Sequence, residues 1–534
     1  MYSSIPSVNT LTALLVAHGI RHAVVCPGSR NAPIVHNLSE CPDIRCYPVT
    51  DERSAAFFAL GIAQATDQPV VVCVTSGTAL LNTAPAVAEA YYQQQSLVII
   101  SADRPAAWID QLDGQTLRQP GVLSPWVECS VSLPENDPWH CNRLVNEALI
   151  EATSHRHSCV HINVPISEPL FNFTLDSLPV ERVIRRFVPA TDYDCLPQQL
   201  LDDFMSAERP LIVFGQLSPR RFHYEGVGNL FSHVIVLHEA LAPFNSVSHF
   251  EALLSQAMLP DFILYVGDAV VSKRLKHFLR RATEAHTWRV QQRGGVEDTF
   301  QNLRGIVEGD TEQVLMALDN KMPKRWNTAA IDYRRHWLHL LSEGRKRDEE
   351  EALPFGQAAV VRELECLLAT SGDRFEVHYA NSTAIRLANR YAKGHPVWCN
   401  RGTNGIDGSL STAAGFSAVV ADSGTKVLCV IGDLSFFYDQ NALWNQNLGG
   451  NLRILLLNNG RGGIFDTLPG LEASPVARNF VAGSHKATAK GICKQNDIRY
   501  LCTDGTNDWP SIIARLLAEE SDRPVLLEVF HGHG

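Results

Sequence analysis

Long hydrophobic runs, a basic N-terminal leader and a repeated Cys-x-x-Cys spacing are all missing from this 534-residue sequence. Its apolar segments, such as residues 70–74 and 452–457, have the length of strands and are soon interrupted, which excludes a membrane span. Residues 1–6 lack the positive start and apolar core of a secretory signal. The 13 cysteines are odd in number and scattered, so we expect reduced thiols, no zinc site and a cytoplasmic location.

Positive charge is also in short supply. The 46 Lys and Arg residues against 57 Asp and Glu residues give a net charge of −11, which argues against nucleic acid or an anionic membrane as a partner. The dinucleotide fingerprint G-x-G-x-x-G is absent from the middle of the chain, where residues 213–216 read Val-Phe-Gly-Gln, so NAD or FAD is disfavoured there. Any anionic ligand would have to be bound by local arginines.

What the sequence does have is a repeated alternation of short apolar runs with helical patterns, over a length that suits about three domains. Several runs lead directly into small polar residues, which is typical of a parallel sheet whose ligand crevice lies at the strand carboxyl ends. In the first third of the chain these runs are residues 22–26, 70–74, 97–100 and 160–165.

We therefore predict an α/β chain of three consecutive doubly wound parallel-sheet domains. Their expected ranges are 1–180, 190–333 and 352–534. A fading periodicity from about residue 171 to residue 197 indicates a linker. The charged stretch at 334–351 is expected to be a solvated connecting helix.

The most informative motif is Gly432-Asp433-Leu434-Ser435, which ends a strongly apolar segment; about 26 residues later another such segment ends in Asn458-Asn459-Gly460. A carboxylate and an amide oxygen delivered from neighbouring strand ends suit a Mg²⁺ ion that holds a diphosphate, and glycine lets the backbone approach closely. Each motif alone is ordinary turn chemistry. Together they favour the metal site.

This pair of motifs resembles the cofactor motif of the thiamine-diphosphate-dependent decarboxylases and synthases. The resemblance implies a metal, Mg²⁺ or Mn²⁺, held by Asp433, the Asn459 side chain and the Arg461 carbonyl, with Asn458 as an alternative to Asn459. It also implies the architecture of that family, cofactor contacts from Gly432, Leu434 and Ser435, and at least a homodimer, with a tetramer left open, because such enzymes commonly bind the cofactor between two subunits.

The same resemblance requires a glutamate from another domain, and Glu52, in Thr50-Asp51-Glu52-Arg53-Ser54, is the candidate. A carboxylate bonded to the aminopyrimidine ring favours the imino tautomer, whose nitrogen can remove the thiazolium C2 proton. A helix-capping role is the alternative for a glutamate at a helix start. Ile406 matches the bulky residue that holds the two cofactor rings together, and Phe465 matches an apolar wall over the cofactor, with core packing as its alternative.

Four arginines stand at or near predicted strand ends, namely Arg30, Arg104, Arg386 and Arg401. Grouping four guanidinium ions in one crevice is costly unless they meet carboxylates, which arginine binds in a bidentate fashion. The substrates should therefore carry several negative charges.

Around these arginines the sequence resembles a narrower family, the 2-succinyl-5-enolpyruvyl-6-hydroxy-3-cyclohexene-1-carboxylate synthases of menaquinone biosynthesis. The matching segments are Gly-Ser-Arg-Asn-Ala-Pro at 28–33, Thr-Asp-Glu-Arg-Ser-Ala at 50–55, Ala-Asp-Arg-Pro at 102–105, Arg-Gly-x-x-Gly-Ile-Asp-Gly at 401–408 and Gly-Asp-Leu-Ser at 432–435. The likeness extends over all three expected domains.

The resemblance implies a transferase that decarboxylates 2-oxoglutarate and adds the succinyl unit to the ring of isochorismate by conjugate addition. By position, Ser29, Arg30, Ser382, Arg386 and Arg401 would bind the substrate carboxylates and the isochorismate ring. The matched positions also include Arg104, Gln115 and the basic pair Lys273 and Arg274, for which a solvated helix start is the alternative. Gly114 stands where some members have Asn, which puts the role of its loop in doubt. Another 2-oxoacid decarboxylase or an acetohydroxyacid-synthase-like carboligase is the alternative function.

Overall fold

The computed structural model describes residues 1–154, 157–187, 193, 195–292, 294–323, 326–468 and 470–531. The chain divides into two compact units. One comprises residues 1–187, 373–381 and 400 onwards, and the other comprises residues 188–372 and 382–399. No described helix combines the length and the hydropathy that a membrane crossing requires.

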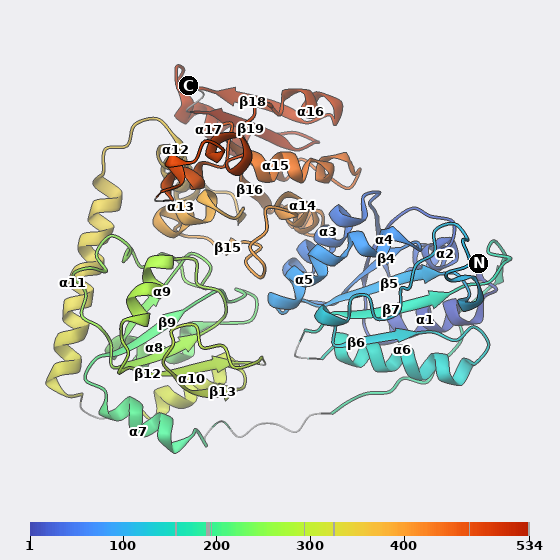
Figure 1. The fold of residues 1–534 in the computed structure, drawn as a ribbon, viewed down its shortest axis with the longest axis horizontal. Coiled ribbons are helices and arrows are strands. Elements are labelled where there is room, and N and C mark those ends of the chain that lie inside the picture. Colours follow the sequence, from blue (N-terminus) through green and yellow to red (C-terminus); the bar gives the residue numbers. More distant parts are fainter. Residues whose placement is uncertain are drawn as a thin grey trace. The chain divides into compact units, whose positions relative to one another are not determined.

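The N-terminal part of the first unit is a parallel sheet with helices on both faces (Figure 1). Its strands are β2 (His22–Val25), β3 (Arg45–Pro48), β4 (Val70–Val74), β5 (Leu97–Asp103), β6 (Cys129–Ser132) and β7 (Val160–Pro165). Its helices are α1 (Pro6–Ala17), α2 (Ala32–Glu40), α3 (Glu52–Thr66), α4 (Thr78–Asn82), α5 (Ala84–Tyr92) and α6 (Pro138–Ala152). A short antiparallel pair joins β1 (Tyr2–Ser3) to β8 (Phe173–Leu175).

The strand order of this sheet is β3-β2-β4-β5-β7-β6. The chain leaves β2 to one side, towards β3, and returns to its other side as β4, so the order reverses between β2 and β4. In doubly wound sheets a crevice opens at the carboxyl ends of the strands at such a reversal. The segments after β2 and β4 are therefore placed to bind ligands.

The C-terminal part of the first unit contains a second parallel sheet, in which β14, β16, β17, β19 and β18 follow one another. These strands are β14 (Phe375–Tyr379), β16 (Lys426–Gly432), β17 (Leu452–Asn458), β18 (Arg499–Thr503) and β19 (Val525–Phe530). The helices are α14 (Ser409–Val420), α15 (Asp433–Tyr438), α16 (Lys490–Gln495) and α17 (Trp509–Ala518). The polar motifs at residues 432–435 and 458–460 thus follow the adjacent strands β16 and β17.

The second unit is built around the parallel sheet β10-β9-β11-β12-β13. Its strands are β9 (Pro210–Phe214), β10 (Ile235–His238), β11 (Phe262–Val266), β12 (His286–Gln291) and β13 (Leu303–Glu308), and β15 (Val397–Trp398) also belongs to this unit. The helices are α7 (Gln198–Ser206), α8 (Gly228–His233), α9 (Lys273–Arg280), α10 (Thr311–Asn320), α11 (Thr328–Glu350), α12 (Gln357–Thr370) and α13 (Thr383–Tyr391).

This sheet is buried on both faces. Leu211 and Val213 pack into one core cluster, whereas Ile212 and Phe214 pack into the other, because successive side chains of a strand point to opposite faces. The long helix α11 buries Tyr333 and Trp337 in the first of these clusters. The charged segment expected to connect two domains is therefore helical, and α11 is also part of a core.

The predicted fold class, three successive α/β parallel sheets with flanking helices, is confirmed. The exact domain boundaries stay a prediction, and residue 190, where the middle domain was expected to begin, lies outside the described residues. The division into two units does not follow the three predicted ranges one by one, because the first unit joins parts of two of them.

The two sheets of the first unit are joined by the packing of α3 on α14. A Cβ added to Gly61 of α3 would lie 1.9 Å from the carbonyl oxygen of Thr412, and one added to Gly415 of α14 would lie 1.9 Å from the carbonyl oxygen of Phe58. Real Cβ atoms do not approach backbone so closely. The two glycines therefore permit a helix crossing that any larger residue would force apart.

We expect Gly61→Ala to destabilise the protein by about 1–3 kcal/mol, because the added methyl group must separate two packed helices. Urea denaturation would measure the change in the free energy of unfolding. The matched control is Gly491→Ala in α16, where nothing lies within 4 Å of the added Cβ. That control should stabilise the protein by about 0.4–1 kcal/mol through the lower entropy of the unfolded chain. Equal effects of the two substitutions would contradict the close-packing argument.

Candidate functional site

The Asp433 carboxylate is the centre of the polar cluster at the ends of β16 and β17. It is 3% exposed, and its Oδ2 accepts hydrogen bonds of 3.1 Å from the backbone N–H groups of both Asn459 and Arg461. Its Oδ1 accepts from the N–H of Leu434 at 2.7 Å, and the Nε2 of His485 lies 3.4 Å from Oδ2. Burial raises the pKa of Asp433, while these N–H groups and the imidazole oppose that rise.

The two neighbouring asparagines have different environments. Asn458 is fully buried; its amide nitrogen donates to Glu528 at 2.7 Å and to the Ala487 carbonyl at 3.0 Å, and its oxygen accepts from the N–H of Gly460. The Asn459 oxygen accepts a long 3.4 Å hydrogen bond from the Arg461 N–H. Both polar atoms of the Asn458 side chain therefore bond to other protein groups, which favours Asn459 as the residue able to hold a ligand.

Among the described residues, no group of three or more His, Cys, Asp and Glu side chains could hold a metal ion. The predicted ligands are one carboxylate, one amide oxygen and one backbone carbonyl, so only Asp433 belongs to those four residue types. The absence of such a group therefore does not bear on the predicted site. The donors that Asp433, Asn459 and Arg461 offer are all oxygens, which suit a hard cation such as Mg²⁺.

Glu52 begins α3, and its neighbours in sequence fix its place. Asp51 caps the helix by accepting from the N–H of Ser54 at 3.0 Å, and its other oxygen accepts from the Asn441 amide at 2.7 Å. Arg53 donates to the Tyr438 carbonyl at 2.9 Å, and its guanidinium lies 4.5 Å from the centre of the Tyr438 ring. Tyr438 ends α15, the helix that begins at Asp433, so Arg53, the neighbour of Glu52, contacts the far end of that helix.

No described residue forms a hydrogen bond with the Glu52 carboxylate. The carboxylate is near Cys26: burial raises the pKa of that thiol well above its usual value, and the charge of Glu52 raises it further. A cavity of about 360 Å³ lies beside this segment, lined by the ends of β2 and β3 and by residues 441 and 444–446. Thr50 and Asp51, the residues that precede Glu52, line this cavity.

Arg401 lies in a loop held by a buried glutamate that the sequence did not single out. Glu89, 1% exposed, accepts hydrogen bonds of 2.7 Å from the backbone N–H groups of Gly402 and Thr403 and one of 2.5 Å from the Thr403 hydroxyl. The Arg401 guanidinium donates to the Asn381 oxygen at 3.2 Å. Its Nε is buried and without a hydrogen-bond partner in the described structure, as expected of a group that awaits an anion.

The only sequence signal for Glu89 was a single acid in the otherwise apolar helix Ala-Pro-Ala-Val-Ala-Glu-Ala-Tyr-Tyr. Buried acids are rare unless they are paired. Its partners Gly402 and Thr403 are 313 and 314 residues away in the sequence. A single acid in an apolar helix therefore could not have identified them.

The two other predicted arginines of the first unit, Arg30 and Arg104, form hydrogen bonds within the protein. Arg30 is 7% exposed and donates to the Ile166 carbonyl at 2.9 Å and to Glu168 at 3.3 Å, although its buried Nε has no partner in the described structure. Arg104 donates from Nε to the Gly114 carbonyl at 2.8 Å and lies 3.1 Å from Asp113. The Gly114 backbone therefore binds Arg104 without needing a side chain.

Several further predicted residues of the first unit are accessible. Ser29 and Gln115 are exposed, and Gln115 has a positive φ of 55° in the loop that follows Arg104. Ile406 is 42% exposed, and Phe465 is half-buried against the position where a Cβ of Gly462 would lie. Large apolar side chains exposed at a site are consistent with contact to a ligand.

The other predicted residues belong to the second unit. Ser382 has a positive φ of 72° and precedes α13, which carries the exposed Arg386. Lys273 and Arg274 are exposed at the start of α9, where the Ser272 hydroxyl accepts from the Leu275 N–H at 3.0 Å. Glu239 accepts from the backbone N–H groups of Val271 and Ser272 and so fixes the start of this helix.

We expect Glu89→Ala to loosen the loop at residues 400–406, because the partly buried N–H groups of Gly402 and Thr403 would lose their acceptor. Hydrogen–deuterium exchange of a peptide covering this loop should become faster. Glu147→Ala is the control, because Glu147 pairs with Arg143 on an exposed face of α6. Unchanged exchange in the Glu89 variant would show that other contacts hold the loop.

Comparison with known proteins agrees with this geometry. Residues 8–121 match a family model described as "Thiamine pyrophosphate enzyme, N-terminal TPP binding domain". A 2-succinyl-5-enolpyruvyl-6-hydroxy-3-cyclohexene-1-carboxylate synthase of Bacteroides fragilis is 44% identical over 554 residues, covering 99% of this chain and 97% of the relative. Enzymes of the same name are 43% identical in Bacteroides thetaiotaomicron and 35% identical in Flavobacterium psychrophilum, each covering 99% of this chain and 96% of the relative.

Relatives this similar, aligned over nearly the whole of both chains, show the family directly. The chain belongs to the 2-succinyl-5-enolpyruvyl-6-hydroxy-3-cyclohexene-1-carboxylate synthases, within the thiamine-diphosphate-dependent enzymes.

Proposed function

We propose that this chain uses thiamine diphosphate and a divalent cation to decarboxylate 2-oxoglutarate and to add the resulting succinyl unit to isochorismate. The product would be the cyclohexene carboxylate in the name of its relatives. The observation that carries the proposal is the buried Asp433 carboxylate at the ends of β16 and β17, which lies 3.1 Å from the N–H groups of both Asn459 and Arg461. We further propose that the protein works in the cytoplasm.

The residues at the ends of β16 and β17 fit the metal and the diphosphate. Asp433, the Asn459 oxygen and the Arg461 carbonyl would hold Mg²⁺, or Mn²⁺, because a bound cation favours the ionised form of a buried carboxylate. Gly432, Leu434 and Ser435, at the start of α15, would contact the diphosphate. The contacts of Asn458 with Glu528 and Ala487 support Asn459 rather than Asn458 as the ligand.

When bound, thiamine diphosphate supplies the electron sink that decarboxylation of a 2-oxoacid requires. Glu52 would hold a proton opposite the aminopyrimidine ring, as an acid–base group with no competing hydrogen bond in the described structure. Ile406 and Phe465 would pack against the cofactor rings. The protein thus contributes binding, orientation and one proton position.

The arginines support a substrate with several carboxylates. Arg401 and Arg30 each keep a buried Nε without a partner in the described structure, and an unpaired guanidinium nitrogen is costly unless a ligand meets it. We assign these two residues, with Ser29, to the substrate carboxylates. By their matching segments, Arg104, Gln115, Ser382, Arg386, Lys273 and Arg274 are proposed for the same role.

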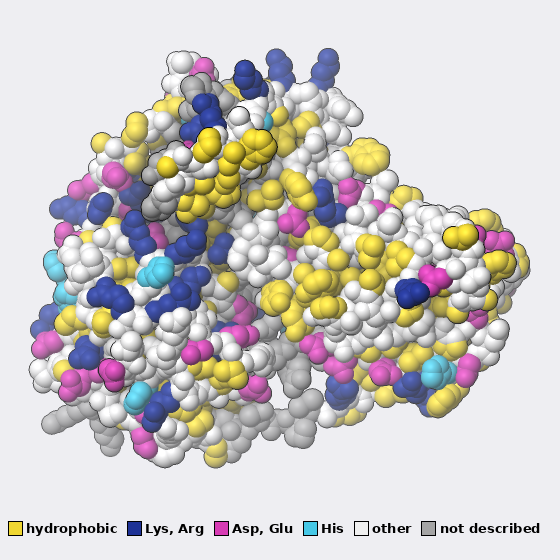
Figure 2. All heavy atoms as spheres, viewed as in Figure 1, with side chains coloured by type: hydrophobic (Ala, Val, Ile, Leu, Met, Phe, Trp, Pro, Cys, Tyr) yellow, Lys and Arg dark blue, Asp and Glu magenta, His cyan; other side chains and the backbone are white. Residues whose placement is uncertain are grey.

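An exposed apolar surface supports a homodimer. Figure 2 shows hydrophobic side chains gathered over the N-terminal part of the first unit. Exposed large apolar side chains of this part include Leu81 at 43%, Tyr92 at 53%, Trp108 at 56% and Leu112. Monomeric proteins rarely expose so many large apolar side chains together. We propose that a second copy of the chain covers part of this surface.

We expect Glu52→Gln to reduce turnover by about 10²–10⁴-fold, the usual contribution of a positioned acid–base group, while the protein stays folded. The assay mixes protein, Mg²⁺, thiamine diphosphate, 2-oxoglutarate and isochorismate and follows CO₂ release and the mass of the adduct. Glu40→Gln, at the exposed end of α2, is the control. Full activity of the Glu52 variant, or an adduct formed from pyruvate instead of 2-oxoglutarate, would refute the proposal.

The two asparagines should respond differently to substitution. Asn459→Ala should raise the Mg²⁺ concentration needed for half-maximal activity by about tenfold or more and leave the melting temperature of the cofactor-free protein unchanged. Asn458→Ala should lower that melting temperature, because it breaks two buried hydrogen bonds. Titration with Mg²⁺ and thermal unfolding measure the two effects, and the reverse pattern would assign the metal to Asn458.

A further inference from the structure

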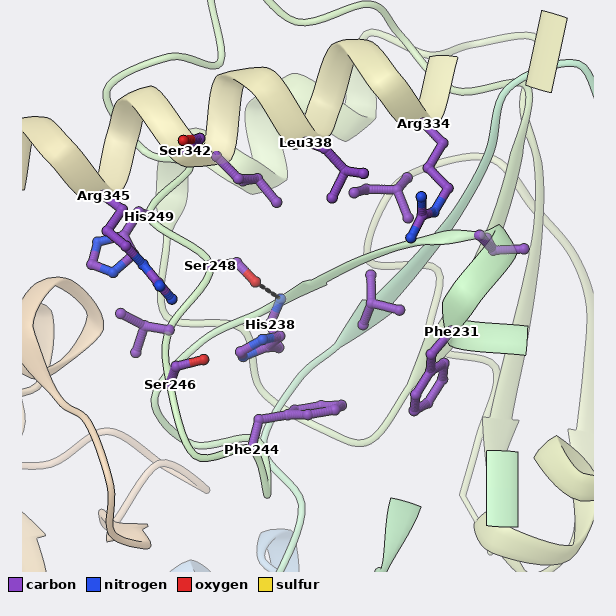
Figure 3. A pocket seen from close by; sticks show the side chains of 15 residues that line it. Phe231, His238, Phe244, Ser246, Ser248, His249, Arg334, Leu338, Ser342 and Arg345 are labelled. Carbon is purple, nitrogen blue, oxygen red and sulfur yellow. Dashed lines mark hydrogen bonds between the residues drawn. The ribbon is translucent and has the colours of Figure 1, made fainter. Parts of the chain in front are cut away.

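A groove of about 390 Å³ lies wholly within the second unit, between β10, the loop that follows it and the helix α11 (Figure 3). Its volume is within the range of small-molecule sites in proteins. None of the residues assigned above to the cofactor, the metal or the substrates lines it. The groove therefore needs its own explanation.

One side of the groove is aromatic. His238, which ends β10, stacks on Phe244 with ring centres 4.3 Å apart and an angle of 26° between the rings. Burial lowers the pKa of His238 to about 4, so the imidazole is neutral near pH 7 and acts as a flat ring. Phe231 adds a third ring, 6.1 Å from Phe244. Such a surface suits a planar group, because stacked and tilted rings attract one another.

The opposite side is one face of α11. Arg334, Leu338, Leu341 and Arg345 line the groove at spacings of four, three and four residues, which places them on one side of a helix. Figure 3 shows Arg334 and Arg345 at opposite ends of the groove, with Leu338 between them. The groove thus has an apolar middle and a cation at each end.

Within the described part of the chain, Arg334 and Arg345 have no negatively charged partner. No acidic residue lines the groove, and no described residue forms an ion pair with Arg334 or Arg345. The Nε of Arg334 is buried and lacks a hydrogen-bond partner in the described structure, as does Nδ1 of His238. A solvated arginine would donate its N–H groups to water. A buried Nε without a partner therefore indicates that a bound anion accepts this hydrogen bond instead of water.

We propose that this groove is a second ligand site, which binds a small organic anion with a planar apolar body and at least one carboxylate, sulfonate or phosphate group. The planar body stacks on His238 and Phe244. The acidic group binds Arg334, and a second acidic group, where the ligand has one, binds Arg345. Leu338 and Leu341 cover the body from the side of α11.

The test compares two fluorescent probes with the same aromatic body and different charge. The probes are 1-anilinonaphthalene-8-sulfonate and the uncharged N-phenyl-1-naphthylamine, added to protein saturated with Mg²⁺ and thiamine diphosphate. We expect Arg334→Gln to weaken binding of the sulfonate about tenfold, because a charge-assisted hydrogen bond is lost. Arg345→Gln, at a more exposed residue, should weaken it about threefold. Neither change should alter the affinity of the uncharged probe.

The matched control is Arg335→Gln, next to Arg334 on the same helix. Arg335 is 74% exposed and pairs with Asp332, so its loss should leave both affinities unchanged. Phe244→Leu should weaken both probes. Unchanged sulfonate affinity in Arg334→Gln and Arg345→Gln, or an equal loss for the uncharged probe, would overturn the proposal. If Arg334→Gln does not fold, the exposed Arg345 decides the outcome alone.

Discussion

The close approach of α3 and α14 is the constraint on which the candidate site depends. At Gly61 and Gly415 each helix backbone occupies the space that a Cβ of the other helix would need. Gly408, at a φ of +75°, leaves room for the ring of Phe57, which a Cβ at this position would overlap. Helices are stiff, so this crossing fixes the position of Glu52 at the start of α3 relative to the loop before α14, which contains Arg401. The two glycines at this apolar helix contact therefore help to bring the polar groups at the start of α3 and before α14 into one compact unit.

A second regularity is that buried carboxylates accept hydrogen bonds from the backbone of loops at or next to the proposed site residues. Asp433 accepts from the N–H groups of residues 459 and 461, Glu89 from those of 402 and 403, and Glu239 from those of 271 and 272. Glu528 accepts from the Ala489 N–H and from Asn458. Loops without regular hydrogen bonding need such acceptors, because a buried N–H left unpaired is costly. Asp433 differs from the other three in that it also faces the proposed metal site.

In the first sheet the apolar runs predicted the interior strands β2, β4, β5 and β7 and neither of the edge strands β3 and β6. Segments such as residues 70–74 and 427–431 are buried along their whole length and read as continuous apolar runs. By contrast, β3, β6, β13 and β18 each lie at the edge of a sheet, with polar residues on their exposed sides, so their composition does not distinguish them from loops. The interior strand β12 does not read as a continuous apolar run, because it buries Arg289, whose charge is compensated by Asp268 and Glu297.

The same contrast holds for the candidate site. Glu52, Asp433 and Asn459 stand in short motifs whose chemistry is local, so sequence alone suffices to propose them. The choice of Asn459 over Asn458 needed the contacts of Glu528, which is 70 residues away, and Glu89 needed partners from a different sheet. Long-range pairing of a single polar residue leaves no pattern in the sequence.

The second unit shows how a parallel sheet can bind charge differently at its strand ends and at its edge. At the ends of β11 and β12 the Arg289 guanidinium lies 4.9 Å from the centre of the Tyr265 ring and within 3.4 Å of both Asp268 and Glu297. Burial raises the pKa of Asp268 to about 6 even though Arg289 opposes the rise. Arg289 is thus neutralised by the protein itself. Beside the edge strand β10, Arg334 and Arg345 lack such partners among the described residues, so the proposed second ligand site lies along α11 rather than at Arg289.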